Sequence, residues 1–199
     1  MKEASSHLPR RIAERVKDLR AARALSLEDL AQRCGVSRSM ISLIERGESS
    51  PTAVVLEKLA AGLGVTLASL FDAPERPTAA ASGPVARRSD QIEWKDPGSG
   101  YVRRNVTPVG AGQPMRIVEV HFPAGARVGF EAESREAPIH QQVWILEGSM
   151  DVTTGKGRHR LKEGDCLAME LDGPTMFHNP TRRRARYAVV IASEPRGRR

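Results

Sequence analysis

The sequence predicts a multidomain α + β protein in which a helical N-terminal domain precedes an antiparallel β domain. Up to Phe71 the apolar residues recur every three or four positions, which is the spacing of a buried helix face. From about Tyr101 they come instead in short runs rich in Val and Ile, and Gly or Pro separates the runs. This change of period occurs once, so we expect a helical domain over residues 1–73 and a β domain over residues 91–195.

Residues 74–90 have the composition of a flexible linker between the two domains. They are rich in Pro, Ala, Ser and Gly and carry no apolar stripe. The last four residues, 196–199, form a short basic tail. Because only eight aromatic residues occur in the chain (two Trp, two Tyr and four Phe), we expect the cores of both domains to be aliphatic.

The net charge of +7 is compatible with a polyanionic partner but can equally serve solubility. The first 73 residues contain eleven Lys and Arg against nine Asp and Glu, so basic groups there must be well placed rather than abundant. Much of the excess lies in arginine runs that we interpret as solvated surface: Arg182, Arg183, Arg184, Arg186, Arg196, Arg198 and Arg199.

The two cysteines and the hydropathy of the chain favour a cytoplasmic protein. Cys34 and Cys166 lie in different predicted domains, so we interpret both as small core residues and not as a disulfide or zinc ligands. No apolar run approaches the roughly 20 residues that cross a bilayer, and the N-terminus lacks the apolar stretch of a secretion signal.

The first helix is predicted from an apolar stripe near the N-terminus. Its members are spaced four, four and three residues apart: Leu8, Ile12, Val16 and Leu19. Pro9 suits the first turn of this helix, because the N–H that proline lacks has no partner there.

Serine caps predict the second and third helices. Ser26 begins the second helix, and Asp29, three residues later, allows a capping box. Gly35 ends that helix in a left-handed turn, and Ser37 caps the third. The buried positions are Leu27, Leu30, Ala31 and Cys34 in the second helix and Ile41 and Ile44 in the third.

A fourth helix and a final turn complete the first domain. Ser50 with Pro51 is predicted to start the fourth helix, and Thr66 to cap a last short turn over residues 66–71. The buried positions of the fourth helix are Leu56, Leu59, Ala60 and Leu63.

The segment from Leu27 to Arg46 has the features of a helix-turn-helix. Ala31 is small where two helices must approach closely, and Gly35 follows four residues later where the chain turns. This pattern resembles the phage-repressor (Cro/C1-type, or XRE) helix-turn-helix family over residues 11–71.

That resemblance implies a five-helix bundle whose third helix, residues 37–46, lies in the major groove of DNA. Arg38 and Ser39 are then the leading base readers, because an arginine can pair in bidentate fashion with guanine. Ser42 and Leu43 are weaker candidates for base contact.

Other predicted DNA contacts lie at the start of the second helix and at the ends of the third. They are Ser26, Leu27, Ser37, Arg46 and Ser49, and Arg33 is either a phosphate contact or an ordinary surface residue. The resemblance also implies a structural ion pair between Arg20 and Glu45, which removes both from the base-reading set.

The second half contains several strand-like segments, which read PMRIVEVHF, HQQVWILEGSMDVT, DCLAM and RYAVVIAS. The segments WILEGSMDV, LKEGDC and PTMFHNP resemble the two motifs of the cupin family over residues 91–194. The resemblance implies an antiparallel β-barrel of the double-stranded β-helix (jelly-roll) type, which acts here as a sensor domain.

The metal ligands of metal-binding cupins are largely missing from this chain. Gln141 stands where the family has a glutamate, and Arg135 and Ala137 stand where it has histidines. His178 alone matches a ligand position, and His140 falls on the opposite strand face from Gln141. We therefore expect no cofactor, with a metal held by His140 and His178 as the alternative.

Three functions remain open. The leading hypothesis is a DNA-binding transcriptional regulator whose β domain binds an unidentified small-molecule effector. The candidate ligand-binding residues are His140, Gln141, Val143, Ile145, Met169 and His178, and Trp144 joins them if the strand twists. The rivals are a cupin enzyme of the non-haem iron type, such as an epoxidase of phosphonate metabolism, and a ligand-free dimerisation module.

A homodimer is expected, because one short recognition helix reads too few base pairs. Two-fold symmetry would give a near-palindromic operator with half-sites about 34 Å apart, or a multiple of that. We expect the β domains to form the dimer contact, with double-stranded DNA as the macromolecular partner and no membrane.

Overall fold

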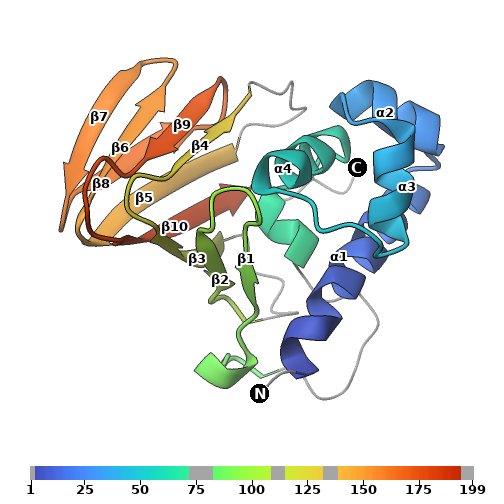
Figure 1. The fold of residues 1–199 in the computed structure, drawn as a ribbon, viewed down its shortest axis with the longest axis horizontal. Helices are drawn as coiled ribbons and strands as arrows, with labels where there is room; N and C mark the ends of the chain where they lie inside the picture. Colours follow the sequence, from blue (N-terminus) through green and yellow to red (C-terminus); the bar gives the residue numbers. More distant parts are fainter. Residues whose placement is uncertain (1–2, 72–82, 109–114, 132–138, 194–199) are drawn as a thin grey trace.

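The computed structural model describes residues 3–71, 83–108, 115–131 and 139–193, and it places the helices at one end of the molecule and the strands at the other (Figure 1). The helices are α1 (Glu3–Ala21), α2 (Leu27–Cys34), α3 (Arg38–Glu45) and α4 (Ala53–Gly62), followed by the 3-10 helix η1 (Leu67–Phe71). None of the described helices is long and apolar enough to cross a membrane. In Figure 1, α2 and α3 lie on the side of the helical domain that faces away from the strands.

The first helix is longer than predicted. It begins at Glu3, so Pro9 lies inside α1 and not in its first turn. The buried stripe is as predicted, since Ile12 and Val16 are almost fully buried and Leu8 and Leu19 nearly so. The apolar spacing therefore located the helix but not its start.

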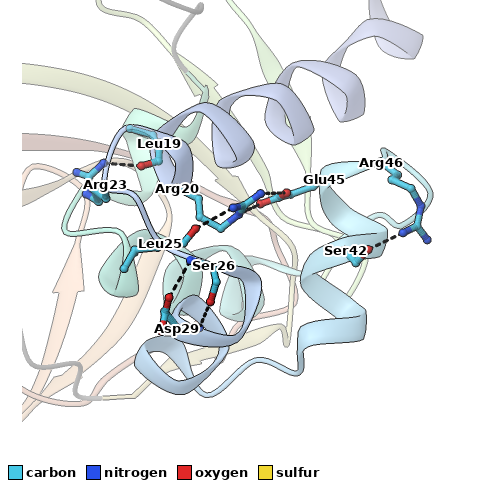
Figure 2. Close-up of polar contacts among 9 residues, drawn as sticks. All are labelled: Leu19, Arg20, Arg23, Leu25, Ser26, Asp29, Ser42, Glu45 and Arg46. Atoms are coloured by element: carbon cyan, nitrogen blue, oxygen red, sulfur yellow. Dashed lines mark hydrogen bonds and ion pairs between the residues drawn. The ribbon is translucent and has the colours of Figure 1, made fainter.

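The capping residues of the second and third helices are confirmed. The Ser26 hydroxyl accepts a hydrogen bond from Asp29 N at 3.0 Å, and the Asp29 carboxylate accepts one from Ser26 N at 2.8 Å (Figure 2). Gly35 adopts the left-handed conformation with φ 61°, and Ser37 accepts from Met40 N. These contacts are local, which is why the sequence predicts them.

The end of the helical domain requires two corrections. Thr52, not Ser50, caps α4 by accepting from Val55 N, because Pro51 precedes the cap instead of following it. The described residues form four α-helices and not five: the last segment is the 3-10 helix η1. The five residues of η1, which follow the Thr66 cap, allow a single tight turn but not a ladder of α-helical bonds.

The β domain consists of two antiparallel sheets. The larger sheet has the strand order β1-β2-β3-β10-β5-β8 and the smaller has the order β4-β9-β6-β7. The strands are β1 (Glu93–Lys95), β2 (Val102–Asn105), β3 (Met115–Phe122), β4 (Arg127–Phe130), β5 (Ile139–Glu147), β6 (Ser149–Thr154), β7 (Gly157–Lys162), β8 (Cys166–Glu170), β9 (Thr175–His178) and β10 (Ala185–Ser193).

The expected closed barrel is wrong for the described residues, in which each strand pairs only within its own sheet. The chain passes from one sheet to the other at Gly148, between β5 and β6, with φ 81°. A Cβ at Gly148 would lie 3.2 Å from the carbonyl oxygen of Arg184. The chain therefore turns a tight corner at Gly148. Such a corner moves the chain from one sheet to the facing sheet, so the hydrogen bonds between strands do not continue around a closed barrel.

The described core of the helical domain is aliphatic, as expected, apart from Phe71, whereas aromatic side chains run through the core of the β domain. Seven rings form one series with centroid distances of 5.5 to 6.2 Å: Phe71, Trp94, Tyr101, Phe122, Tyr187, Phe177 and Phe130. The series begins in η1 of the helical domain and ends in the smaller sheet. The chain has only eight aromatic residues, but all of them except Trp144 belong to this series of ring contacts.

The two domains pack against each other. Asp96, which is buried, accepts a hydrogen bond from Ala53 N at 2.8 Å and so caps α4 from the β domain. Lys58 of α4 pairs with Glu131 at 2.7 Å. Of the predicted linker 74–90, residues 74–82 lie outside the described residues, as does the tail 196–199, while Arg88–Asp90 forms a 3-10 helix, η2.

Candidate nucleic-acid interface and effector cavity

The first turn of α3 presents polar side chains to solvent. Ser37, Arg38 and Ser39 are all exposed, whereas Ile41 and Ile44 on the opposite face are buried. Met40 is exposed beside them, and sequence reasoning did not select it. The predicted base readers, Arg38 and Ser39, are thus accessible to DNA. The buried apolar face of the same helix anchors it to the rest of the domain.

A bidentate ion pair joins α3 to α1. Arg20 donates from Nε and Nη2 to the two carboxylate oxygens of Glu45 at 2.7 and 2.8 Å, and from Nη1 to the Leu25 carbonyl at 2.9 Å (Figure 2). The hydrogen bonds to Glu45 raise the pKa of Arg20. This confirms the predicted pair and accounts for both side chains without DNA.

The guanidinium group of Arg46, a predicted phosphate contact, already forms hydrogen bonds within the protein. Its Nε and Nη2 donate to the Glu48 carboxylate at 2.9 and 2.8 Å, and its Nη1 donates to the Ser42 hydroxyl (Figure 2 shows the Ser42 contact). These hydrogen bonds lower the pKa of Glu48. Sequence reasoning missed Glu48, although an acid two residues beyond a basic phosphate contact is a visible signal.

The other predicted DNA contacts border the same surface. Ser26 is exposed, but its hydroxyl is engaged in the cap of α2. Leu27, Ser42 and Leu43 are half-buried, and the half-buried Ser49 donates weakly to the sulfur of Met40. Arg33 is exposed in the last turn of α2.

A cavity of about 100 Å³ lies between the two sheets and is closed in part by the helical domain. Glu57 of α4 and Thr66 and Leu67 near η1 line it. The β domain contributes polar and charged side chains, namely Tyr101, Arg103, Glu131, Gln141, Thr175 and Tyr187, and apolar ones that include Val118, Val120, Phe122, Phe177 and Ile191.

Arg103 is the buried cation of this cavity. It is 5% exposed, and its guanidinium lies 4.6 Å from the centre of the Phe71 ring. Its Nε has no hydrogen-bond partner among the described residues. Burial lowers the pKa of Arg103, and it raises the pKa of Tyr101 to about 12 and that of Tyr187 well above its ordinary value, so both tyrosines stay neutral.

Sequence reasoning missed Arg103, although two consecutive arginines in a strand must point to opposite faces and one of them inward. Of the six residues predicted to bind a ligand, Gln141 alone lines this cavity. Val143 and Ile145 are fully buried in the core, where packed neighbours leave them no access to it. Met169 lies beside Gln141, with 3.4 Å between its sulfur and the Gln141 amide nitrogen.

His140 and His178 do not line this cavity. His140 lines a second pocket together with Gln141 and Met169, so the assignment of these residues to a ligand site stays a prediction. His140 is exposed on β5, on the opposite strand face from Gln141, as parity predicts, and Trp144 shares that outer face. His178 on β9 alternates with the buried Phe177, and its Nδ1 lies 3.9 Å from Asp151 of the neighbouring strand. Burial lowers the pKa of His178.

The described residues do not fit a metal centre. They contain no cluster of three or more His, Cys, Asp or Glu side chains in ligand geometry. His140 and His178 belong to different sheets, and the carboxylate nearest His178, that of Asp151, already accepts hydrogen bonds from Arg158 and Arg160. The proposed alternative of a metal shared by these two histidines therefore has no geometric support.

The fold and the exposed recognition helix define a helix-turn-helix DNA-binding protein with a C-terminal β domain. Residues 16–70 match the helix-turn-helix family profile. The chain is 40% identical over 175 residues to the HTH-type transcriptional regulator SutR of Escherichia coli K12, covering 87% of this chain and 89% of SutR. The protein belongs to this family of XRE-type helix-turn-helix transcriptional regulators and binds DNA sequence-specifically.

Two further comparisons extend over both domains. The HTH-type transcriptional regulator PuuR of E. coli K12 is 28% identical, covering 83% of this chain and 86% of PuuR. The crystal structure of an HTH_3 family transcriptional regulator from Vibrio cholerae superposes with a TM-score of 0.75 at 27% identity, covering 96% of this chain and 99% of the other. The whole two-domain arrangement is thus shared with a known regulator structure.

Proposed function

We propose that the protein is a dimeric regulator whose DNA binding changes when a small molecule occupies the cavity of the β domain. The observation that carries this proposal is that residues of both domains line the cavity, Glu57 and Leu67 from the helical domain and Arg103 from the β domain. A ligand shifts an equilibrium only if it binds two arrangements with different affinity. A site shared between domains meets that requirement, because any change in domain docking changes the site.

The exposed face of the larger sheet supports a second copy of the chain as the dimer partner. Met115, Ile117 and Trp144 are 56%, 42% and 49% exposed there, and Ile117 is in register with Val190 of β10. Exposed apolar side chains gathered on one sheet face are typical of an interaction surface. A dimer formed this way gives the two recognition helices that a near-palindromic operator requires.

Selection of bound sequences from a random duplex pool tests the DNA-binding part of the proposal. We expect a near-palindrome with half-sites about 34 Å apart, or a multiple of that. Trp144→Glu should shift the protein toward monomer in sedimentation velocity and weaken binding to the full site more than to a half-site. A wild-type monomer that protects one unpaired half-site would contradict the dimer.

A catalytic role is the less supported alternative. A non-haem iron enzyme needs a carboxylate beside two histidines, and Gln141 occupies the position where the cupin motif has that carboxylate. Metal analysis of protein purified without chelators separates the two functions. Stoichiometric iron that is lost in His178→Ala would favour the enzyme.

A further inference from the structure

Arg103 lies on the inner face of the larger sheet with an unsatisfied donor. In the strand register it stands between Trp94 of β1 and Val120 of β3, both of which are buried. Its Nε has no hydrogen-bond partner among the described residues. A buried guanidinium group is stable only when its charge and its donors are matched. A hydrogen bond with Tyr101 and the attraction of Glu57 meet part of this requirement. The cavity offers the remaining donor, Nε, to an anion, and this donor is already desolvated.

The rest of the lining limits the size and polarity of the anion. The lining is mostly aliphatic or aromatic, and its hydroxyls come from Thr66, Tyr101, Thr175 and Tyr187. Its two carboxylates are those of Glu57 and Glu131, and Glu131 is paired with Lys58. At roughly 10–15 Å³ of such space for each water-sized group, about 100 Å³ admits only a small molecule. A planar guanidinium matches a carboxylate in bidentate geometry.

We propose that this cavity binds a short-chain organic carboxylate, with its oxygens on Arg103 and its apolar chain against the aromatic lining. The inference deepens the proposed effector function and rests on it. It names the chemical class of the effector and the residue that recognises it.

The same site explains how ligand binding affects the DNA-binding domain. Glu57 of α4 lines the cavity and attracts Arg103 electrostatically, and the Phe71 ring of η1 contacts the guanidinium. A bound carboxylate neutralises Arg103 and repels Glu57. Occupancy thus changes how α4 is held against the β domain, and α4 packs directly against α2 of the helix-turn-helix.

The test compares butyrate with butyramide, its neutral counterpart of similar shape, by calorimetry and thermal shift on the full chain. Butyrate should bind and raise the melting temperature, and butyramide should not. Arg103→Gln should weaken butyrate binding about tenfold or more. The matched control Arg127→Gln removes an exposed arginine of β4 and should leave it unchanged. Equal binding of both compounds, or no binding of butyrate, valerate or 2-aminobutyrate to the wild type, overturns the proposal.

A second variant keeps the proposal falsifiable if Arg103→Gln does not fold. Glu57→Gln retains the shape of the α4 side chain and removes one of the two carboxylates of the lining, the one that acts on Arg103. It should tighten butyrate binding severalfold and reduce the effect of butyrate on operator affinity. Unchanged or weaker binding of butyrate to Glu57→Gln counts against the site.

The two levels of inference fail in different ways. If the protein selects a palindrome but no carboxylate binds, the carboxylate site is wrong and an effector of another class remains open. If butyrate binds through Arg103 and operator affinity does not change at saturation, the site is correct and the effector function is wrong.

Discussion

The residues of α3 fall into two groups, one exposed to solvent and one buried in the core. The exposed Arg38 and Ser39 follow the cap Ser37, while Ile41 and Ile44 pack inward. The side chains that would contact bases therefore carry little of the stability of the domain. Substitutions at the exposed positions should change DNA recognition without unfolding the protein.

Arg38→Ala should relax the sequence preference of the protein. A bidentate arginine–guanine pair contributes about 1–3 kcal/mol of discrimination, so the variant should lose that preference at one base pair of each half-site. Competition between the selected operator and single-base variants measures it. Arg46→Ala is the comparison and should weaken all sequences about equally. A uniform loss of affinity in Arg38→Ala would contradict the docking of α3.

Glu48→Gln should strengthen DNA binding, because Glu48 occupies the guanidinium that Arg46 would otherwise offer to a phosphate. Binding should tighten for specific and random duplexes alike. The slope of log affinity against log salt should become steeper by up to about one. Titrations at several salt concentrations measure both effects, with the exposed Glu163→Gln in the β domain as the control. Unchanged or weaker binding would show that Arg46 makes no phosphate contact.

The helices α2 and α4 approach each other closely at a glycine. A Cβ placed on Gly62 would lie 2.7 Å from the Cβ of Cys34. Real Cβ atoms do not come this close, so a side chain at Gly62 must push the two helices apart. The contact matters for function because α2 begins with the predicted phosphate contacts Ser26 and Leu27.

Gly62→Ala should therefore destabilise the protein by about 1–3 kcal/mol through overpacking. Urea unfolding measures the loss. Gly155→Ala is the matched control, since a Cβ there meets nothing within 4 Å. If Gly62→Ala leaves the free energy of unfolding unchanged, α2 and α4 can move apart without loss of stability.

Strand parity is the part of the β domain that the sequence predicts well. Gln141 faces the cavity and His140 faces solvent, because successive side chains in a strand point to opposite sides. Parity does not say which inward residues border a cavity and which are packed. Val143 and Ile145 point inward like Gln141, but neighbouring side chains fill the space around them.

Across the part of the chain that the structure describes, the two domains share one continuous core. The aromatic series crosses from Phe71 to Trp94 at 5.5 Å, and Asp96 caps α4 from the β domain. These contacts are buried and involve both domains. The two domains should consequently stabilise each other.

A single cooperative unfolding transition is expected. Helical circular dichroism and tryptophan fluorescence, with Trp144→Phe used to isolate Trp94, should give the same urea midpoint. Asp96→Ala should cost about 1–3 kcal/mol because Ala53 N would lose its buried acceptor. Asp165→Ala in an exposed turn is the control and should cost less than about 1 kcal/mol. Two separate midpoints in the wild type would contradict the shared core.

The amino-acid sequence by itself predicts the helix-turn-helix of this protein. Caps at Ser26 and Ser37, the turn at Gly35 and the apolar stripes act over a few residues, so their spacing is legible in the chain. The effector cavity is different, because Arg103, Glu57 and Gln141 come from distant segments that only packing brings together. A polar residue becomes a buried ligand contact through what surrounds it, and its surroundings are a property of the tertiary structure.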